Sequence, residues 1–143
     1  MFVKVINNLP VKYPYTLGDL YKENPQTSFP SVIPDSVLEL YGVYKVESSI
    51  FPDVDSKTHK LAQSVEKIGG KWTQVWTKTE LPLETASNNV RSYRSRLLSE
   101  SDWTQTEDSP VDKNSWKTYR QNLRDISTQE GFPYNIIWPT PPS

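Results

Sequence analysis

One stretch near the end of the chain holds most of what the sequence says about the fold. It runs from Arg91 to Pro139 and reads RSYRSRLLSESDWTQTEDSPVDKNSWKTYRQNLRDISTQEGFPYNIIWP. Two sets of residues in this stretch, the first beginning one residue before it, are spaced three or four positions apart. The members of each set therefore share one helix face. These sets are Val90, Tyr93, Leu97 and Ser101, and then Trp116, Tyr119, Leu123 and Ile126. Two amphipathic helices joined by a short polar linker predict an αα-hairpin.

The linker between the two helical patterns is polar and runs from Asp102 to Asp112. Asp112 is a helix-capping residue type, and both Asp108 and Asp112 lie where the positive end of the second helix dipole favours carboxylates. Gly131 predicts the end of the second helix, and Pro133 prevents the helix from resuming. The sequence therefore gives this hairpin a defined start and stop.

The same stretch resembles the tail assembly chaperone family of tailed bacteriophages, over about a third of the chain. The matching residues are Arg96-Leu97-Leu98, Asp102-Trp103-Thr104-Gln105, Asp108-Ser109-Pro110, Trp116, Tyr119-Arg120-Gln121, Leu123-Arg124-Asp125-Ile126, Gly131-Phe132-Pro133 and Trp138-Pro139. A looser resemblance covers the front of the chain, at Pro14–Leu17, Asn24-Pro25, Ser28–Pro30 and Tyr41–Tyr44. The resemblance implies a protein that helps tail fibres to fold or attach, or a part of a fibre protein.

The first forty residues predict short elements separated by connections. Met1 to Ile6 is rich in Val, Ile and Phe and predicts a strand, whereas Asn7 to Pro14 is interpreted as a connection. Thr16 followed by Asp19 is a capping arrangement, which predicts a short helix from Leu17 to about Glu23.

The middle of the chain predicts one more short helix, from Asp35 to Tyr41, and then strands. Val43 to Val46 is interpreted as a strand. Two alternating runs, Lys60 to Ile68 and Lys71 to Thr79, flank Gly69-Gly70. Two glycines between such runs favour a two-residue hairpin turn, because that turn needs positive φ.

Together these elements predict an α+β fold with two parts. Residues 1–81 form a small N-terminal lobe with short strands, short helices and a β-hairpin. Residues 82–143 form the C-terminal αα-hairpin and an extended tail rich in aromatic residues and proline.

Composition limits the classes of partner and site. The formal net charge is −1, with 16 basic and 17 acidic residues, which gives no reason to expect nucleic acid as a partner. The chain has no cysteine, so disulfides and thiolate metal sites are excluded. No apolar run approaches the ~20 residues that span a bilayer, and we expect no membrane partner.

No catalytic residue, metal site or cofactor is expected, and we predict that the chain is not an enzyme. The single histidine, His59, lies in a polar stretch with no cysteine nucleophile or G-x-S-x-G motif elsewhere, and is interpreted as an exposed side chain. Asp53 and Asp55, with Asp19 if the fold allows, offer hard oxygen ligands. They lack the glycine and the distal glutamate of an EF-hand loop, which favours a solvated acidic turn.

The hairpin contains charged and aromatic residues with two alternative roles. Arg120 or Arg124 can clamp the joint by pairing with Asp102 or Asp108, or these groups can bind a partner. We favour the clamp, and we interpret Trp103 and Trp116 as part of the hairpin core. The residues expected to stabilise the hairpin are Asp102, Trp103, Trp116, Tyr119, Arg120, Leu123 and Arg124.

The tail after Gly131 contains a cluster of apolar residues among four prolines. The cluster comprises Phe132, Tyr134, Ile136, Ile137 and Trp138. The segment is too rich in proline for a helix, so we expect an extended arm or an edge strand. Two interpretations stay open: the tail folds back over the helices, or it is a partner-binding arm that adds to a sheet edge.

The expected function follows from the resemblance. It is a phage tail protein that binds the tail fibre and assists its folding or attachment, present in the host cytoplasm during assembly. The alternative is a permanent structural subunit in the virion tail that connects the fibre and a baseplate protein, with an oligomeric state set by the trimeric fibre. A glycan-processing module is a third class, but it needs paired carboxylates ~5–9.5 Å apart beside exposed rings, and no spacing in the sequence supports that.

Overall fold

The structure is a computed structural model that describes all residues, Met1 to Ser143. The chain divides into two compact units, which are described separately below. Unit 1 contains residues 1–53 and 61–77, and unit 2 contains residues 54–60 and 78–143. Segments 54–60 and 78–81, which the sequence placed in the N-terminal lobe, are thus part of unit 2.

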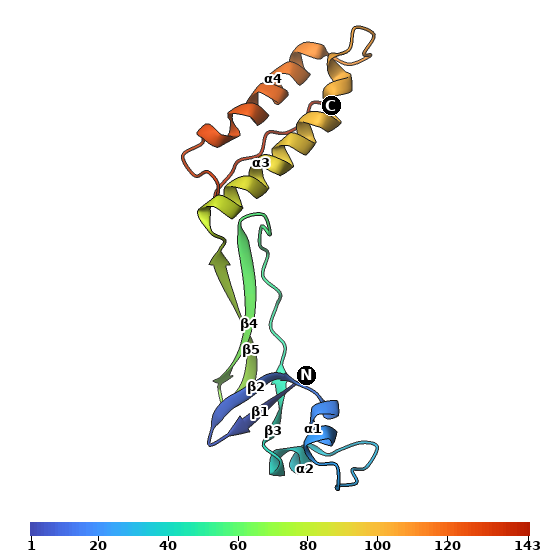
Figure 1. Cartoon of the computed structure of the whole chain (residues 1–143), viewed down its shortest axis with the longest axis vertical. Helices are drawn as coiled ribbons and strands as arrows, with labels where there is room; N and C mark the ends of the chain where they lie inside the picture. Colours follow the sequence, from blue (N-terminus) through green and yellow to red (C-terminus); the bar gives the residue numbers. More distant parts are fainter. The chain divides into compact units, whose positions relative to one another are not determined.

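The chain contains both strands and helices, and the predicted α+β class is confirmed (Figure 1). The strands are β1 (Phe2–Ile6), β2 (Leu9–Tyr15), β3 (Val43–Glu47), β4 (His59–Ile68) and β5 (Lys71–Glu80). They form one sheet in the order β2-β1-β3-β5-β4, in which β1 is antiparallel to β2 and to β3, and β3 is parallel to β5. The predicted hairpin is confirmed as β4 and β5, with positive φ at both Gly69 and Gly70.

The interpretation of Asn7 to Pro14 as a connection was wrong, because most of this segment is strand β2. Asn7 and Asn8 both adopt positive φ and reverse the chain between β1 and β2. This is the geometry of a tight hairpin turn, for which asparagine is a suitable residue type. Pro10 and Pro14 lie within β2, and the sheet accepts them because β2 is an edge strand.

The two short helices of unit 1 are α1 (Leu17–Glu23) and α2 (Asp35–Leu40). The predicted capping box is confirmed: the Asp19 backbone N–H donates to Thr16 Oγ1, and the Thr16 backbone N–H donates to Asp19 Oδ2. Because each side chain satisfies a backbone donor of the other residue, the first turn of α1 is fixed at its start.

Apolar side chains are buried on both faces of the sheet in unit 1. On one face, Tyr15 and Val43 pack with Leu20 of α1 and Leu38 of α2. On the other face, four residues form a second cluster, with Tyr13, Tyr44 and Val46 packed around it: Val3, Val5, Val65 and Trp72. Alternate residues of β1 and β3 supply the two clusters, as the period of a strand requires.

An ionic network next to α1 predicts that unit 1 loses stability in acid. A hydrogen bond from Lys12, with further bonds from Thr16, holds the pKa of Asp19 well below its usual range. Hydrogen bonds from Tyr15 and Lys4 lower the pKa of Glu23. Because both pKa values are lower in the folded state, the unfolded chain binds more protons in acid. The stabilisation is complete above the unfolded values of about 4 and is lost as the pH falls through the folded values.

Urea unfolding of unit 1 between pH 7 and pH 2 measures this effect. The urea midpoint should fall steadily below pH 4, and an Asp19→Asn, Glu23→Gln double variant should show a flatter dependence from a lower starting value. If the urea midpoint depends on pH equally in the wild type and the double variant, the loss of stability in acid comes from other carboxylates.

Unit 2 is built on a helical hairpin. Helix α3 (Leu83–Glu100) and helix α4 (Lys113–Arg124) pack against each other, and short 3-10 turns follow each of them at Asp102–Gln105 and Asp125–Thr128. Helix α3 begins at Leu83, about two turns before the predicted pattern. The chain has no helix with the length and apolar character needed to cross a bilayer.

Candidate functional site

The two helices of the hairpin meet along an apolar seam. Tyr119, Leu123 and Ile126 are buried on the α4 side of the seam. Ala86 and Val90 are buried in α3. The spacing of three and four residues puts these side chains of α4 on one face of the helix, and this buried seam gives the surface of the hairpin a rigid support.

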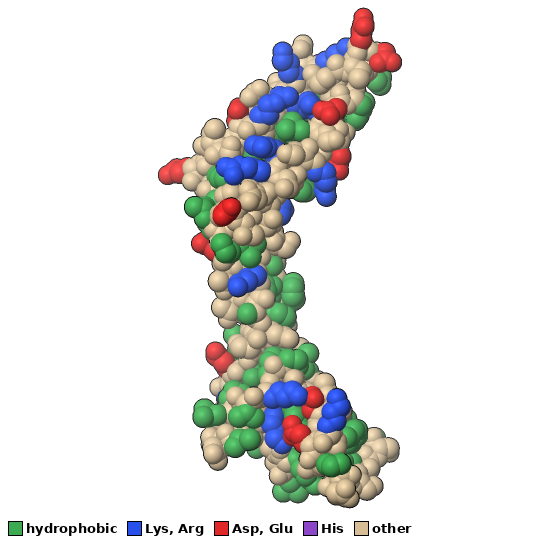
Figure 2. Space-filling model, viewed as in Figure 1, with side chains coloured by type: hydrophobic (Ala, Val, Ile, Leu, Met, Phe, Trp, Pro, Cys, Tyr) green, Lys and Arg blue, Asp and Glu red, His purple; other side chains and the backbone are tan.

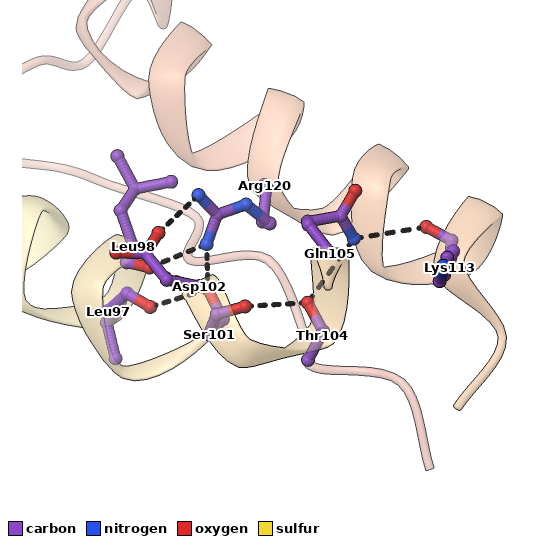
Figure 3. Close-up of polar contacts among 8 residues, drawn as sticks. All are labelled: Leu97, Leu98, Ser101, Asp102, Thr104, Gln105, Lys113 and Arg120. Atoms are coloured by element: carbon purple, nitrogen blue, oxygen red, sulfur yellow. Dashed lines mark hydrogen bonds and ion pairs between the residues drawn. The ribbon is translucent and has the colours of Figure 1, made fainter. Parts of the chain in front are cut away.

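Arg120 is the one buried charged residue of the hairpin, and only 8% of it is exposed. Its Nη1 donates to the Leu98 carbonyl oxygen at 2.6 Å and to Ser101 Oγ at 2.7 Å, and its Nη2 donates to Asp102 Oδ1 at 2.6 Å (Figure 3). A guanidinium can make these bonds together because its donors are fixed in one plane. Arg120 therefore ties α4 to the end of α3.

Polar bonds around this arginine extend into the joint between the helices. Ser101 Oγ also donates to the Leu97 carbonyl oxygen, and Thr104 Oγ1 donates to the Ser101 carbonyl oxygen. Gln105 reaches the first turn of α4, where its Nε2 donates to the Lys113 carbonyl oxygen at 3.3 Å (Figure 3). The 3-10 turn is thus bonded to the start of α4.

The cap predicted for the second helix is confirmed, but most of the predicted ion pairs in the joint do not form. Asp112 caps α4 by accepting from the Asn114 N–H. A hydrogen bond from the Ser115 hydroxyl, together with the bond from the Asn114 N–H, lowers the pKa of Asp112. Arg124 is exposed and enters no ion pair, and Asp108 contacts neither arginine. Of the pairs considered from the sequence, the structure forms only Arg120 with Asp102.

The expectation that Trp103 lies in the hairpin core was wrong, since 51% of this residue is exposed. Its ring lies tilted against Trp116, with 6.1 Å between ring centroids, and Trp116 in turn meets the buried Tyr119 edge to face at 5.5 Å. Trp116 is half-buried. The aromatic row therefore runs from the seam to the surface, and Trp103 is its exposed end.

The aromatic tail folds back along α3, within unit 2 (Figure 1). Trp138 meets Tyr93 of α3 edge to face at 4.8 Å, and the Tyr134 hydroxyl donates to the Leu81 carbonyl oxygen at 2.7 Å. Gln129 exchanges two hydrogen bonds with the backbone of Ile137. No strand forms in the tail, so the edge-strand interpretation was wrong, and the structure favours the fold-back over the free arm.

The five apolar tail residues divide by exposure. Phe132, Tyr134, Ile136 and Trp138 are half-buried, whereas 79% of Ile137 is exposed. Phe132 also lies under the Arg91 guanidinium at 5.3 Å, and Trp138 lies near the Lys57 ammonium at 5.9 Å. Four of the expected partner-binding residues thus contribute to folding of unit 2, and Ile137 remains available at the surface.

A pair of alanine variants tests this division. Trp138→Ala should lower the free energy of unfolding of unit 2 by about 1–3 kcal/mol, because it removes an aromatic pair and a cation–π contact. Ile137→Ala is the matched control and should change it by about 0.5 kcal/mol or less. Thermal unfolding followed by circular dichroism at 222 nm measures both, and equal melting temperatures would mean that the tail does not stabilise the helices.

His59 is not the plain exposed residue that the sequence suggested. It is half-buried, its Nδ1 lies 2.8 Å from Thr58 Oγ1, and its ring meets Tyr134 edge to face at 5.9 Å. Asp55 accepts from the Lys57 N–H and pairs with the Lys57 ammonium at 3.0 Å. No group of three or more His, Cys, Asp or Glu side chains is placed to hold a metal ion.

Sequence reasoning missed two partners of Arg120. Ser101 was assigned only to the helix face, and the Leu98 carbonyl is a backbone group that has no signal in the sequence. A serine at the end of an amphipathic pattern, where an apolar residue is expected, was the one available hint, because a buried hydroxyl needs a hydrogen-bond partner.

Comparison with known families bears on this part of the chain. Residues 87–143 match the family described as phage tail assembly chaperone protein. The match spans most of α3, the joint, α4 and the folded-back tail, and it confirms the resemblance noted from the sequence for this part of the chain. No curated protein and no solved structure matches the chain.

Proposed function

From the match of residues 87–143 to the phage tail assembly chaperone family, we propose that this chain binds the tail-fibre protein of a tailed phage and assists its folding or attachment. The match itself supports a role in phage tail assembly. Two further points are part of the proposal: the client is the fibre protein, and the chain acts without enzymatic chemistry. The chain acts in the host cytoplasm while tails are assembled.

The surface of the hairpin supports a binding role. A buried seam and the buried Arg120 hold the two helices together, while Trp103 and Ile137 are exposed at the surface of the same unit. Tryptophan is enriched among the residues that contribute most to protein interfaces. A rigid support with exposed apolar side chains is what a protein that binds other proteins needs.

A second candidate is a permanent virion subunit that connects the fibre and a baseplate protein. Unit 1 favours it, because 93% of Ile50 and 83% of Leu40 are exposed, and Val32 and Phe51 are exposed as well. Permanent interfaces bury more, and more apolar, surface than transient ones. In that case the chain stays in the virion tail at a ratio set by the trimeric fibre.

Co-expression tests the proposed function. The fibre protein of the same phage is produced with and without this chain, and soluble trimer is measured by size-exclusion chromatography with light scattering. We expect several-fold more soluble trimer in the presence of the chain. An equal yield of trimer, together with no association between the two purified proteins, would refute the proposed function.

A further inference from the structure

Helix α4 carries four cationic side chains and no acidic one. They are Lys113, Lys117, Arg120 and Arg124. The intervals of four, three and four residues put them on one side of the helix, next to the side that packs on α3. Figure 2 shows several lysine and arginine side chains over the helical hairpin, with acidic side chains at its tip and along its edges.

The fold itself uses only part of this row. Arg120 is buried and bonded to Asp102, and Lys113 Nζ donates to the Glu107 carbonyl oxygen at 2.8 Å. Lys117 and Arg124 are exposed and enter no ion pair. Like charges three or four residues apart destabilise a helix. Repulsion between Lys117 and the neighbouring cations therefore destabilises α4, and no ion pair of Lys117 within the chain offsets it.

An aromatic pair lies beside the cationic row. Trp116 is three residues after Lys113 and four before Arg120, so its ring emerges next to the row. Its neighbour Trp103 is the exposed end of the pair. We call these five residues the Trp–Lys surface: Trp103, Lys113, Trp116, Lys117 and Arg124.

We propose that the Trp–Lys surface binds an acidic segment of the tail-fibre protein, with an apolar side chain of that segment seated on the tryptophan pair. The inference rests on the proposed function and names the chemistry of its client. Lys117 and Arg124 are two turns apart, about 11 Å along the helix. That distance matches two carboxylates seven residues apart on a partner helix, or three to four residues apart on an extended segment.

The charge distribution favours an acidic polypeptide over nucleic acid. The net charge of the chain is −1, and only two cations of the row are free of other bonds. Three carboxylates lie in the joint just before the cationic row: Glu107, Asp108 and Asp112. They would repel the phosphate backbone of a nucleic acid that extended beyond α4. An acidic segment that ends at the tryptophan pair avoids this repulsion.

The experiment compares the wild-type chain with three double variants and one single variant. Lys117→Glu with Arg124→Glu reverses the row, and Lys117→Gln with Arg124→Gln removes its charge with less risk to the helix. Lys22→Glu with Lys78→Glu is the control with the same change in net charge at exposed positions outside the surface. Trp103→Ala removes the exposed ring. Circular dichroism checks the fold of each variant.

Binding is measured by biolayer interferometry at 50 and 200 mM salt with three probes: the fibre protein, poly-L-glutamate and a 20-base-pair DNA duplex. We expect the reversed variant to bind the fibre at least about tenfold more weakly than the control, and the neutral variant to fall between them. Trp103→Ala should weaken fibre binding by about thirtyfold, as loss of a central aromatic residue does. Poly-L-glutamate should bind weakly, at low salt only, and not to the reversed variant.

The outcomes separate the inference from the function on which it rests. If the fibre binds the wild type and the reversed variant equally, the Trp–Lys surface is not its site, and the proposed function stands. In another outcome, the fibre binds neither the wild type nor the reversed variant, while poly-L-glutamate binds the wild type and not the reversed variant. In that case the fibre is not the client, and the Trp–Lys surface is a site for another acidic protein. Row-dependent binding of the DNA duplex in preference to poly-L-glutamate overturns the inference in favour of nucleic acid.

Discussion

Replacing Arg120 by methionine should lower the free energy of unfolding of unit 2 by about 2–4 kcal/mol. Methionine keeps the apolar volume of the side chain but removes the donors to the Leu98 carbonyl, Ser101 Oγ and Asp102. Hydrogen bonds from a charged group contribute more than neutral ones, and one of these acceptors, Ser101 Oγ, is buried. Urea unfolding followed at 222 nm measures the loss.

Two neighbouring variants serve as controls for Arg120. Arg124→Met, four residues later on an exposed position, should change stability by about 0.5 kcal/mol or less. Asp102→Asn should cost at most about 1 kcal/mol, because 65% of the Asp102 side chain is exposed. Equal losses for Arg120→Met and Arg124→Met would show that the buried guanidinium does not hold the hairpin together.

The second large effect is expected at Gly42, between α2 and β3. Gly42 has φ of 68°, a left-handed conformation that costs other residues about 1–3 kcal/mol. A Cβ at this position would also fall against the Val5 carbonyl oxygen, closer than real Cβ atoms approach a backbone atom. Since Val5 donates its own N–H to the Gly42 carbonyl at 2.7 Å, β1 cannot move away without losing that bond. Gly42→Ala should therefore unfold unit 1 at clearly lower urea.

Gly69 supplies the matched control for this prediction. Its φ is 58°, similar to that of Gly42, but no atom lies within 4 Å of the place where a Cβ would be. Gly69→Ala therefore carries the conformational cost alone, and the difference between the two variants measures the collision with Val5. If both variants lower the free energy of unfolding of unit 1 equally, the close approach of Gly42 to β1 does not contribute to the loss in Gly42→Ala.

Local signals in the sequence predicted the elements whose ends are fixed by their own residues. The Thr16–Asp19 box, the Gly69-Gly70 turn and the Asp112 cap each satisfy backbone groups within a few positions, so a short window contains the information. Strand β2 was missed for the opposite reason. Its prolines argue against a strand until it is known that the strand lies at a sheet edge, and that is a property of the whole sheet.

The site divides in the same way between local and long-range information. Helical spacing selected Tyr119 and Leu123 because the burial of a helix face follows its period. Arg120 was selected by its chemistry, since a guanidinium can pair with a carboxylate in the joint. Trp103 lies after the end of α3, in a 3-10 turn to which the helix period does not apply, and its exposure depends on how that turn meets α4. Lys57 likewise reaches Tyr93 across a long sequence separation that no local pattern reports.

We propose that this chain binds the fibre only during assembly and, unlike a permanent tail subunit, is not retained in the finished virion. Quantitative mass spectrometry of purified infectious virions and of fibre complexes from phage-producing cells tests it most directly. We expect the chain to co-purify with fibre protein from the cells and to be absent from the virions. A fixed integer ratio of the chain to fibre protein in the virions would contradict it and would make the chain a permanent tail subunit.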